Sequence, residues 1–281
     1  MEGHGTAFGA GTIINAIASY KGGAFCIDLK TEATVSLKGD LIEGEIEGGG
    51  DTRLIERACE LVLDLYGIDS GAKVMTKSQV PQASGLKSSS AAANATVLAA
   101  LRAIGRSMEP LDMVRLGVKA ALDTGVSITG AFDDACASML GGVVLTDNRQ
   151  NELLKREPIE SAVAIYAPDK KAFSGQTNVK RSRAIAPWVD IAFGMAMDGE
   201  YEKAMTLNGF LYTGALGFSP EPMLAALELG IRGVSLSGTG PSYVALVKNG
   251  EELDKLKAAW SGYPGKVIIT KTNNEGAFTL K

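Results

Sequence analysis

The chain has 281 residues, of which 46% are hydrophobic and 21% are charged, a balance typical of a globular protein with a large core. Its 28 basic and 32 acidic residues give a net charge of -4, which excludes a general attraction to nucleic acid or to an anionic membrane. The chain starts without the basic segment of a secretory signal, and no apolar run is long enough to span a bilayer. We therefore expect one compact, cytoplasmic protein.

Hydrophobic periodicity predicts a mixture of strands and helices. Glycine-punctuated β-prone runs at 24–29 and 33–37 indicate that sheet comes first. From 52 to 66, apolar side chains recur at helical spacing opposite charged ones, and Gly67 stands where this helix would end. The further expected elements are, in chain order, a strand at 73–80, an alanine-rich helix ending near 104, a helix at 111–123, a short helix ending before 141, strands at 142–145 and 162–166, helices at 181–197, 201–215 and 221–229, strands within 233–247, a helix at 251–260 and a strand at 266–270.

The order of these elements is mixed, without the strict alternation of a doubly wound parallel sheet. We therefore expect an α+β, two-layer fold made of two intimately packed halves, 1–155 and 156–281. The three cysteines, Cys26, Cys59 and Cys136, are an odd number without metal-type spacing. Each has apolar neighbours, so we expect reduced, buried thiols.

A loop rich in glycine and serine joins the strand at 73–80 to the alanine-rich helix. Gly85 allows the backbone to approach a ligand, the serines that follow can donate hydrogen bonds, and the first turn of the helix presents unpaired N–H groups. Together they predict an anion site, with an ordinary serine-capped helix as the alternative. The chain contains no Walker A motif, and 9–14 lacks the last glycine of a dinucleotide fingerprint.

Two segments resemble the motifs of GHMP kinases. The run Gly-Leu-Lys-Ser-Ser-Ser-Ala at 85–91 is similar to their nucleotide loop, and Leu-Ser-Gly-Thr-Gly-Pro-Ser at 236–242 is similar to their C-terminal glycine loop. The resemblance covers essentially the whole chain and implies a left-handed βαβ unit in the first half and a mixed-order α/β sandwich in the second. It implies that ATP contacts Gly85, Leu86, Lys87, Ser88, Ser89, Ser90, Ala91, Ser237, Gly238, Thr239 and Gly240.

Lys87 departs from most of this family, which has glycine at the same place. The archaeal shikimate kinases carry the same Gly-Leu-Lys-Ser-Ser-Ser-Ala run, so the chain resembles this group most closely. A lysine beside the phosphates would add positive charge where phosphoryl transfer concentrates negative charge. A solvated surface lysine is the alternative.

A pair of carboxylates lies in the segment 129–135, before the predicted short helix. The segment resembles the part of GHMP kinases that carries a catalytic aspartate, and counting from Gly141 favours Asp134, whereas residue-by-residue matching favours Asp133. We choose Asp134. The resemblance also implies magnesium held by Ser89 and Asp123. A plain helix cap at 133–134 and a surface role for Asp123 are the alternatives.

The resemblance implies that the N-terminal region, including Asn15, contributes to the acceptor pocket for shikimate. The carboxylate of such an acceptor needs a cation. The candidates are Lys21, Lys180, Arg181 and Arg183, and a loose basic cluster adds Lys170 and Lys171. A solvated helix start is the alternative explanation for most of these side chains.

Two other functions remain open at this point. The first is another GHMP kinase, above all a homoserine kinase, although Lys87 and the Asp133–Asp134 pair differ from the usual pattern there. The second is a non-catalytic nucleotide-binding or RNA-binding module, which the acidic balance disfavours. His4, the single histidine, is too little for a zinc cluster. We therefore expect ATP, magnesium and a small-molecule acceptor, without nucleic acid or membrane.

Overall fold

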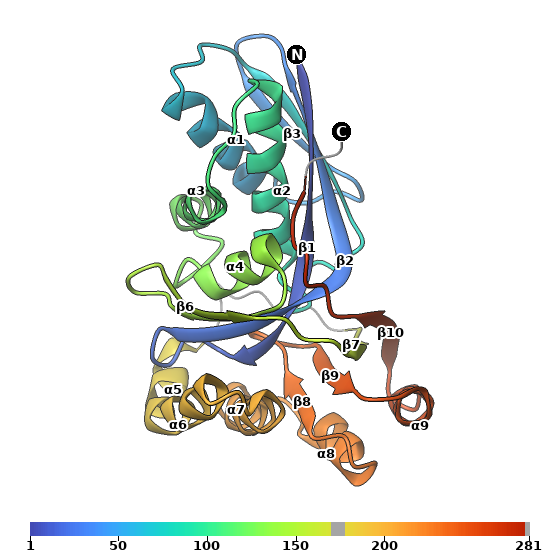
Figure 1. The fold of residues 1–281 in the computed structure, drawn as a ribbon. Coiled ribbons are helices and arrows are strands. Elements are labelled where there is room, and N and C mark those ends of the chain that lie inside the picture. The colour runs from blue at the N-terminus through green and yellow to red at the C-terminus, as the bar shows by residue number, and fades with distance from the viewer. Residues whose placement is uncertain (170–177, 279–281) are drawn as a thin grey trace.

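The computed structural model describes residues 1–169 and 178–278, arranged as two sheets with helices packed on them (Figure 1). In the first sheet the strand order is β3-β4-β2-β5-β6, and β1 pairs with β2 beside this path. β3 and β4 are parallel, and the helix between them in sequence makes a βαβ unit. The strands of this sheet are β1 (Glu2–Ile14), β2 (Lys21–Leu37), β3 (Ile42–Ile46), β4 (Ala72–Ser78), β5 (Val143–Asp147) and β6 (Glu152–Glu157).

The second sheet has the order β10-β7-β9-β8, with antiparallel pairing throughout. After it, the chain returns beside β1 and β2 through the bridges Ile27–Thr272 and Thr6–Phe278. The strands are β7 (Ala162–Pro168), β8 (Gly233–Leu236), β9 (Tyr243–Val247) and β10 (Gly265–Lys271). The helices are α1 (Arg53–Leu65), α2 (Ser88–Ala103), α3 (Pro110–Asp123), α4 (Phe132–Leu140), α5 (Val179–Ala184), α6 (Ala186–Met197), α7 (Tyr201–Leu216), α8 (Glu221–Glu228) and α9 (Gly250–Trp260).

The alanine-rich helix α2 packs directly on β1. A Cβ atom added to Gly3 would lie 2.2 Å from the carbonyl oxygen of Ala99, and one added to Gly5 would lie 2.3 Å from that of Ala95. Glycine on the strand and alanine on the helix therefore allow two backbones to approach each other more closely than larger residues would. This contact fixes the middle and the C-terminal turns of α2 against β1.

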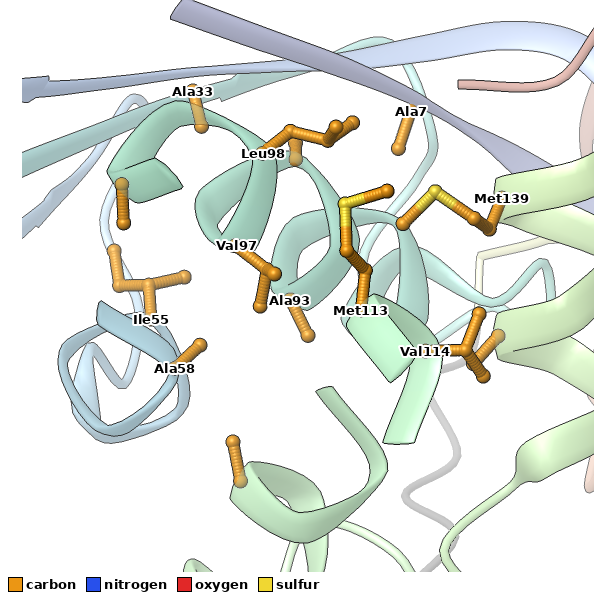
Figure 2. Close-up of a cluster of buried hydrophobic side chains, with 14 of the residues drawn as sticks. Ala7, Ala33, Ile55, Ala58, Ala93, Val97, Leu98, Met113, Val114 and Met139 are labelled. Atoms are coloured by element: carbon orange, nitrogen blue, oxygen red, sulfur yellow. The ribbon is translucent and has the colours of Figure 1, made fainter. Parts of the chain in front are cut away.

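The buried side chains form two clusters. The first lies between β1, β2 and β4 on one side and α1 to α4 on the other, and Figure 2 shows Val97 and Leu98 of α2 among its members. The second surrounds the second sheet, yet it includes Ile13, Phe25 and Val143 from the first half. The expected boundary at 155/156 falls within β6. Because the second cluster contains side chains from both halves, the two halves share their packing.

The predicted α+β class is confirmed, as are the helices at 52–66 and 111–123, which the structure has as α1 and α3. Two strands expected at 24–29 and 33–37 are one strand, β2, because the polar residues between them continue the ladder with β1. The helix expected at 181–197 is wrong as a single element. It breaks at Ile185, and Pro187 then occupies the first turn of α6, where a missing N–H costs nothing.

The three cysteines are free and buried, and burial raises the pKa of the Cys26 thiol. In the described part of the chain, no helix combines the length and the apolar character needed to cross a membrane.

Candidate active site

The loop before α2 and the loop between β8 and β9 meet face to face. Ser237 Oγ donates to the Gly85 carbonyl oxygen over 2.8 Å, and Ser242 N donates to the Ser84 carbonyl oxygen over 3.1 Å. Gly85 has φ +82°, and a Cβ atom there would lie 2.1 Å from the Ser237 carbonyl oxygen. A side chain at this position would push the loops apart, so the contact requires glycine.

These loops border a cavity of about 560 Å³. Of the residues expected at the nucleotide, those that line it are Gly85, Lys87, Ser88, Ser89, Ser90, Gly238 and Thr239. The others lie behind the lining and are buried: Leu86, Ala91, Ser237 and Gly240. Leu86 has a supporting role, since its carbonyl oxygen accepts a hydrogen bond from Ala10 N of β1 over 3.1 Å.

The N-terminus of α2 opens into this cavity. The first intrahelical hydrogen bond runs from Ala91 N to the Lys87 carbonyl oxygen, so the N–H groups of the three serines before it have no partner within the helix. These groups and the partial positive charge of the helix end favour an anion. The anion site stays a prediction, for which the open helix N-terminus provides the donors.

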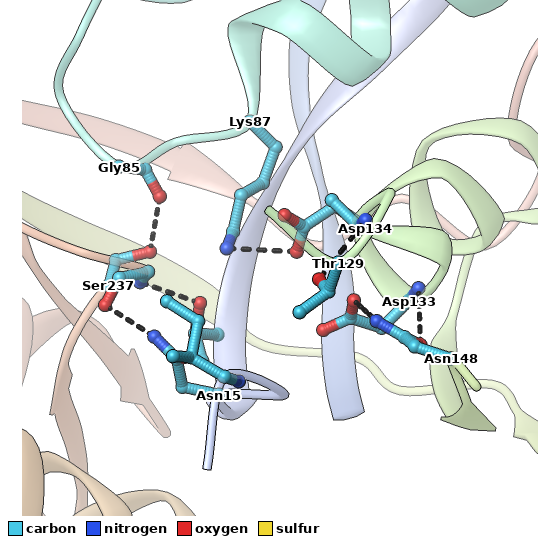
Figure 3. Close-up of polar contacts among 12 residues, drawn as sticks. Asn15, Gly85, Lys87, Thr129, Asp133, Asp134, Asn148 and Ser237 are labelled. Carbon is cyan, nitrogen blue, oxygen red and sulfur yellow. Dashed lines mark hydrogen bonds and ion pairs between the residues drawn. The ribbon is translucent and has the colours of Figure 1, made fainter. Parts of the chain in front are cut away.

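Lys87 connects the loop to the acidic start of α4. Its Nζ atom lies 2.8 Å from Asp134 Oδ1, and the side chains of both residues are largely buried, with 8% and 14% exposed (Figure 3). Lys87 has φ +67°, a left-handed conformation that costs a non-glycine residue free energy. The lysine is thus an internal cation facing the cavity, and the alternative of a solvated surface lysine does not fit its burial.

Asp133 lies beside this pair and is 4% exposed. Asn148 Nδ2 donates to its Oδ1 atom over 2.7 Å. Burial and the neighbouring Asp134 carboxylate raise the pKa of Asp133 to about 7, while Lys87 and the Asn148 hydrogen bond oppose the rise. Asp133 and Asp134 both line the cavity.

The two residues expected to hold magnesium are not brought together. Ser89 lines the cavity, whereas Asp123 is absent from the described lining. The Asp123 carboxylate accepts hydrogen bonds from Arg57 Nε over 2.8 Å and from Lys119 Nζ over 3.1 Å, and these cations lower its pKa. Across 1–169 and 178–278, no three His, Cys, Asp or Glu side chains cluster as a metal site. In this structure the Asp123 carboxylate is therefore engaged by two cations, while Ser89 faces the cavity, and their role in binding magnesium stays a prediction.

Asn15 connects the end of β1 to the C-terminal glycine loop. Its Nδ2 atom donates to the Gly238 carbonyl oxygen over 2.8 Å, and its backbone N–H donates to Asn208 Oδ1 over 3.1 Å. The backbone N–H of Ile17 donates to Asn15 Oδ1 over 3.0 Å. Asn15 lines the cavity, but its amide is occupied by these structural contacts.

The cations expected at the acceptor lie outside the described lining of the cavity. Lys21 Nζ lies 3.9 Å from Asp190 Oδ1 and 5.6 Å from the centre of the Phe193 ring. Arg183 Nη2 donates to the Tyr20 hydroxyl over 3.2 Å. Lys180 and Arg181 are exposed on α5, and Lys170 and Lys171 fall outside the described residues.

Sequence reasoning missed the hairpin between β5 and β6. Asn148 binds Asp133, and the Arg149 guanidinium carbon lies 4.8 Å from the centre of the Tyr20 ring. The available signal was a polar stretch, Thr146 to Arg149, which begins within β5 directly after its buried apolar residues. Nothing in the sequence shows that this stretch folds against the start of α4.

Comparison with known proteins places the chain in a family. The model described as "GHMP kinases N terminal domain" matches residues 53–142, and "GHMP kinases C terminal" matches residues 199–265. A protein named "Shikimate kinase" from Methanocella arvoryzae is 73% identical over 100% of this chain and 97% of its own length. Another with this name, from Methanosarcina acetivorans, is 62% identical over the same shares of the two chains.

Solved structures with the same fold are far more distant in sequence. The homoserine kinase of Cytophaga hutchinsonii has a TM-score of 0.79 at 20% identity, covering 99% of this chain and 97% of its own. The mevalonate kinase of Methanococcus jannaschii has a TM-score of 0.76 at 17% identity, covering 97% of both chains. The chain therefore belongs to the GHMP kinases and, within them, to the same family as the two shikimate kinases.

Proposed function

We propose that this protein transfers the γ-phosphate of ATP to the 3-hydroxyl of shikimate, giving ADP and shikimate 3-phosphate. The observation that carries the proposal is the internal Lys87–Asp134 pair at the open N-terminus of α2, inside a cavity bordered by both glycine loops. This arrangement offers an anion site, a cation and a carboxylate within one pocket, which are the parts that phosphoryl transfer needs. The acceptor is taken from the names of relatives 60–73% identical to this chain.

ATP would place its phosphates against the first turn of α2. The N–H groups of Ser88, Ser89 and Ser90 would bind phosphate oxygens, and Lys87 Nζ would stabilise the negative charge of the transferred group. Since the described residues offer no metal cluster of their own, magnesium would enter as the MgATP complex. Its charge would then neutralise phosphate oxygens on the nucleotide itself.

Asp134 would orient the 3-hydroxyl of the acceptor for attack on the γ-phosphorus. As the new O–P bond forms and the bond to the ADP oxygen breaks, the hydroxyl proton would pass to an Asp134 carboxylate oxygen. Lys87, whose Nζ atom lies 2.8 Å from Asp134 Oδ1, would hold this carboxylate in position. Asp133 would lie beside the pair, held by Asn148.

The acceptor carboxylate would contact Arg183, which already lies against Tyr20 at the turn between β1 and β2. Lys21 is the weaker candidate because Asp190 and Phe193 engage it, and Lys180 lies on the exposed face of α5. A guanidinium can bind a carboxylate with two parallel hydrogen bonds, which a lysine cannot. The buried, unpaired cysteines agree with a reducing compartment, so we place the protein in the cytoplasm.

The test is magnesium-dependent release of ADP from ATP with shikimate, homoserine, mevalonate, galactose or no acceptor. We expect strong stimulation by shikimate alone, and phosphorus NMR of the product should show an ester at the 3-position. Stimulation by homoserine instead would keep the chemistry and refute the acceptor. ATP binding without turnover on any acceptor would refute the kinase and favour a nucleotide-binding module.

A further inference from the structure

A buried amide at the end of β5 holds the acidic start of α4. Asn148 is 5% exposed and directly follows the last residue of β5. Its Nδ2 atom donates to Asp133 Oδ1 over 2.7 Å, and its Oδ1 atom accepts from Asp133 N over 3.2 Å (Figure 3). One side chain therefore binds both the carboxylate and the backbone of Asp133.

Thr146 determines which end of this amide faces the carboxylate. Thr146 is fully buried, and its Oγ1 atom donates to Asn148 Oδ1 over 2.7 Å. The amide oxygen thus accepts two hydrogen bonds, from the threonine hydroxyl and from Asp133 N. A flipped amide would place N–H groups against the Asp133 N–H and would turn its oxygen toward the carboxylate. The donating end must therefore point at Asp133.

The other sides of Asp133 are also confined. A Cβ atom on Gly22 of β2 would lie 2.6 Å from Asp133 Cγ, so this strand packs directly on the carboxyl group. Asn148 N donates to the Tyr20 carbonyl oxygen over 2.8 Å, which ties the same residue to the turn before β2. Because Asp133 and Asp134 are consecutive in the first turn of α4, holding the first sets the direction in which the second reaches Lys87.

The titratable groups that face Asp133 come from three elements. They are Asp134 and Cys136 of α4, Lys87 of the phosphate loop and Tyr212 of α7. Burial and Asp134 raise the pKa of Asp133, whereas Lys87 and the hydrogen bond from Asn148 lower it. Without the donor on Asn148, the charged form of Asp133 loses one of its stabilising contacts, so Asp133 should bind its proton at higher pH.

We propose that Asn148, oriented by Thr146, is a positioning residue that holds the two consecutive carboxylates for phosphoryl transfer. The inference rests on the proposed function, because it assigns Asn148 a part in that reaction. Asn148 acts through Asp133 and does not itself need to touch the substrates. Its contribution should therefore be visible in turnover and in its pH dependence, and much less in the affinity for ATP.

The test compares kcat and KM of Asn148→Ala, Thr146→Val and Thr146→Ser between about pH 5.5 and pH 9. For Asn148→Ala we expect kcat to fall about 10- to 100-fold, with the KM for ATP within about twofold. Because the charge of Asp133 acts on the neighbouring Lys87–Asp134 pair, the pH dependence of kcat should carry the titration of Asp133, and its midpoint should rise by about half a unit to one unit. Thr146→Val should shift it in the same direction by less, and Thr146→Ser should restore the original midpoint.

A matched control separates these effects from lost stability. Asn249→Ala removes an asparagine that caps α9, where its Oδ1 atom accepts from Glu252 N over 2.9 Å. This variant should be less stable with an unchanged midpoint. An unchanged midpoint in Asn148→Ala and Thr146→Val, or an equal shift in Asn249→Ala, would overturn the inference. If Asn148→Ala does not fold, Thr146→Val and Thr146→Ser decide.

A second measurement does not depend on the acceptor. Carbon-13 NMR of protein labelled at the aspartate carboxyl carbons, with Asp133→Asn to assign the signal, follows the titration of Asp133 without any substrate. An upward shift of its midpoint in Asn148→Ala or Thr146→Val supports the inference even if shikimate is not the acceptor. An unchanged midpoint contradicts it even if the wild-type protein phosphorylates shikimate.

Discussion

Replacing Lys87 separates its charge from its backbone conformation. Lys87→Met removes the cation and keeps a side chain at φ +67°, whereas Lys87→Gly removes both the cation and the backbone strain. Glycine is also acceptable at the residue before a helix. The two variants thus share the loss of the ion pair with Asp134 and differ in the cost of the left-handed conformation.

The sizes of both effects follow from the structure. A non-glycine residue in this conformation costs about 1–2 kcal/mol, partly offset by the greater freedom of glycine in the unfolded chain. We therefore expect Lys87→Gly to be more stable than Lys87→Met by about 1 kcal/mol, or about 2 °C in Tm. Both variants should lose about 100- to 1000-fold in kcat, because one preorganised charge next to the reacting group is missing.

Urea unfolding and steady-state kinetics on the two variants check these expectations side by side. Equal stability of Lys87→Gly and Lys87→Met would show that the backbone conformation carries no cost. Turnover close to wild type in either variant would refute the role of the cation, and a loss in Lys87→Met alone would mean that side-chain bulk, not charge, is responsible.

Three further predictions concern residues around this pair. Asp134→Asn should nearly abolish turnover with little change in ATP affinity, measured by isothermal titration calorimetry; full activity would reject Asp134 as the nucleophile-orienting group. Gly85→Ala should raise the KM for ATP about 10-fold or more and lower Tm, because its Cβ atom would meet the Ser237 carbonyl oxygen; kinetics and a melting curve like those of the wild type would contradict this contact. The pKa of Asp133, about 7, lies above its ordinary value, so the stability that its neutral form provides at low pH is lost as the pH rises through 7; Asp133→Asn should therefore gain stability over the wild type at pH 8 and none at pH 4 in urea titrations, and an equal difference at both pH values would argue against the raised pKa.

Much of the fold could be predicted because local patterns decide it. The amphipathic pattern of α1 and the alanine-rich run of α2 define those helices without help from the rest of the chain. β6 was missed, and β1 and β3 were expected only as part of a sheet-forming N-terminal region, without bounds of their own. In β3 and β6 the side chains alternate between half-buried and exposed at edges of the sheet, which weakens the strand pattern. The break between α5 and α6 was missed for a different reason, since proline is compatible with both a helix start and a kink.

The site could be predicted only in part. The motifs around Gly85 and Ser237 were recognisable, and the structure brings them together although they are 152 positions apart. The partners of Asp123 and Asp133 were not predictable, because Arg57 and Asn148 approach them from other elements of the fold. An aspartate at a position where the sequence predicts a metal ligand, such as Asp123, can thus be paired with a cation that no local pattern reveals.

The most direct test of the account is a double-mutant cycle on Lys87 and Asp134, with kcat measured for Lys87→Met, Asp134→Asn and the pair of substitutions together. If the two side chains act as one unit on the reacting groups, the double variant should be about as impaired as the more impaired single variant. Fully additive losses, with the double variant impaired by the product of the two single effects, would contradict the claim that this ion pair is the centre of the active site.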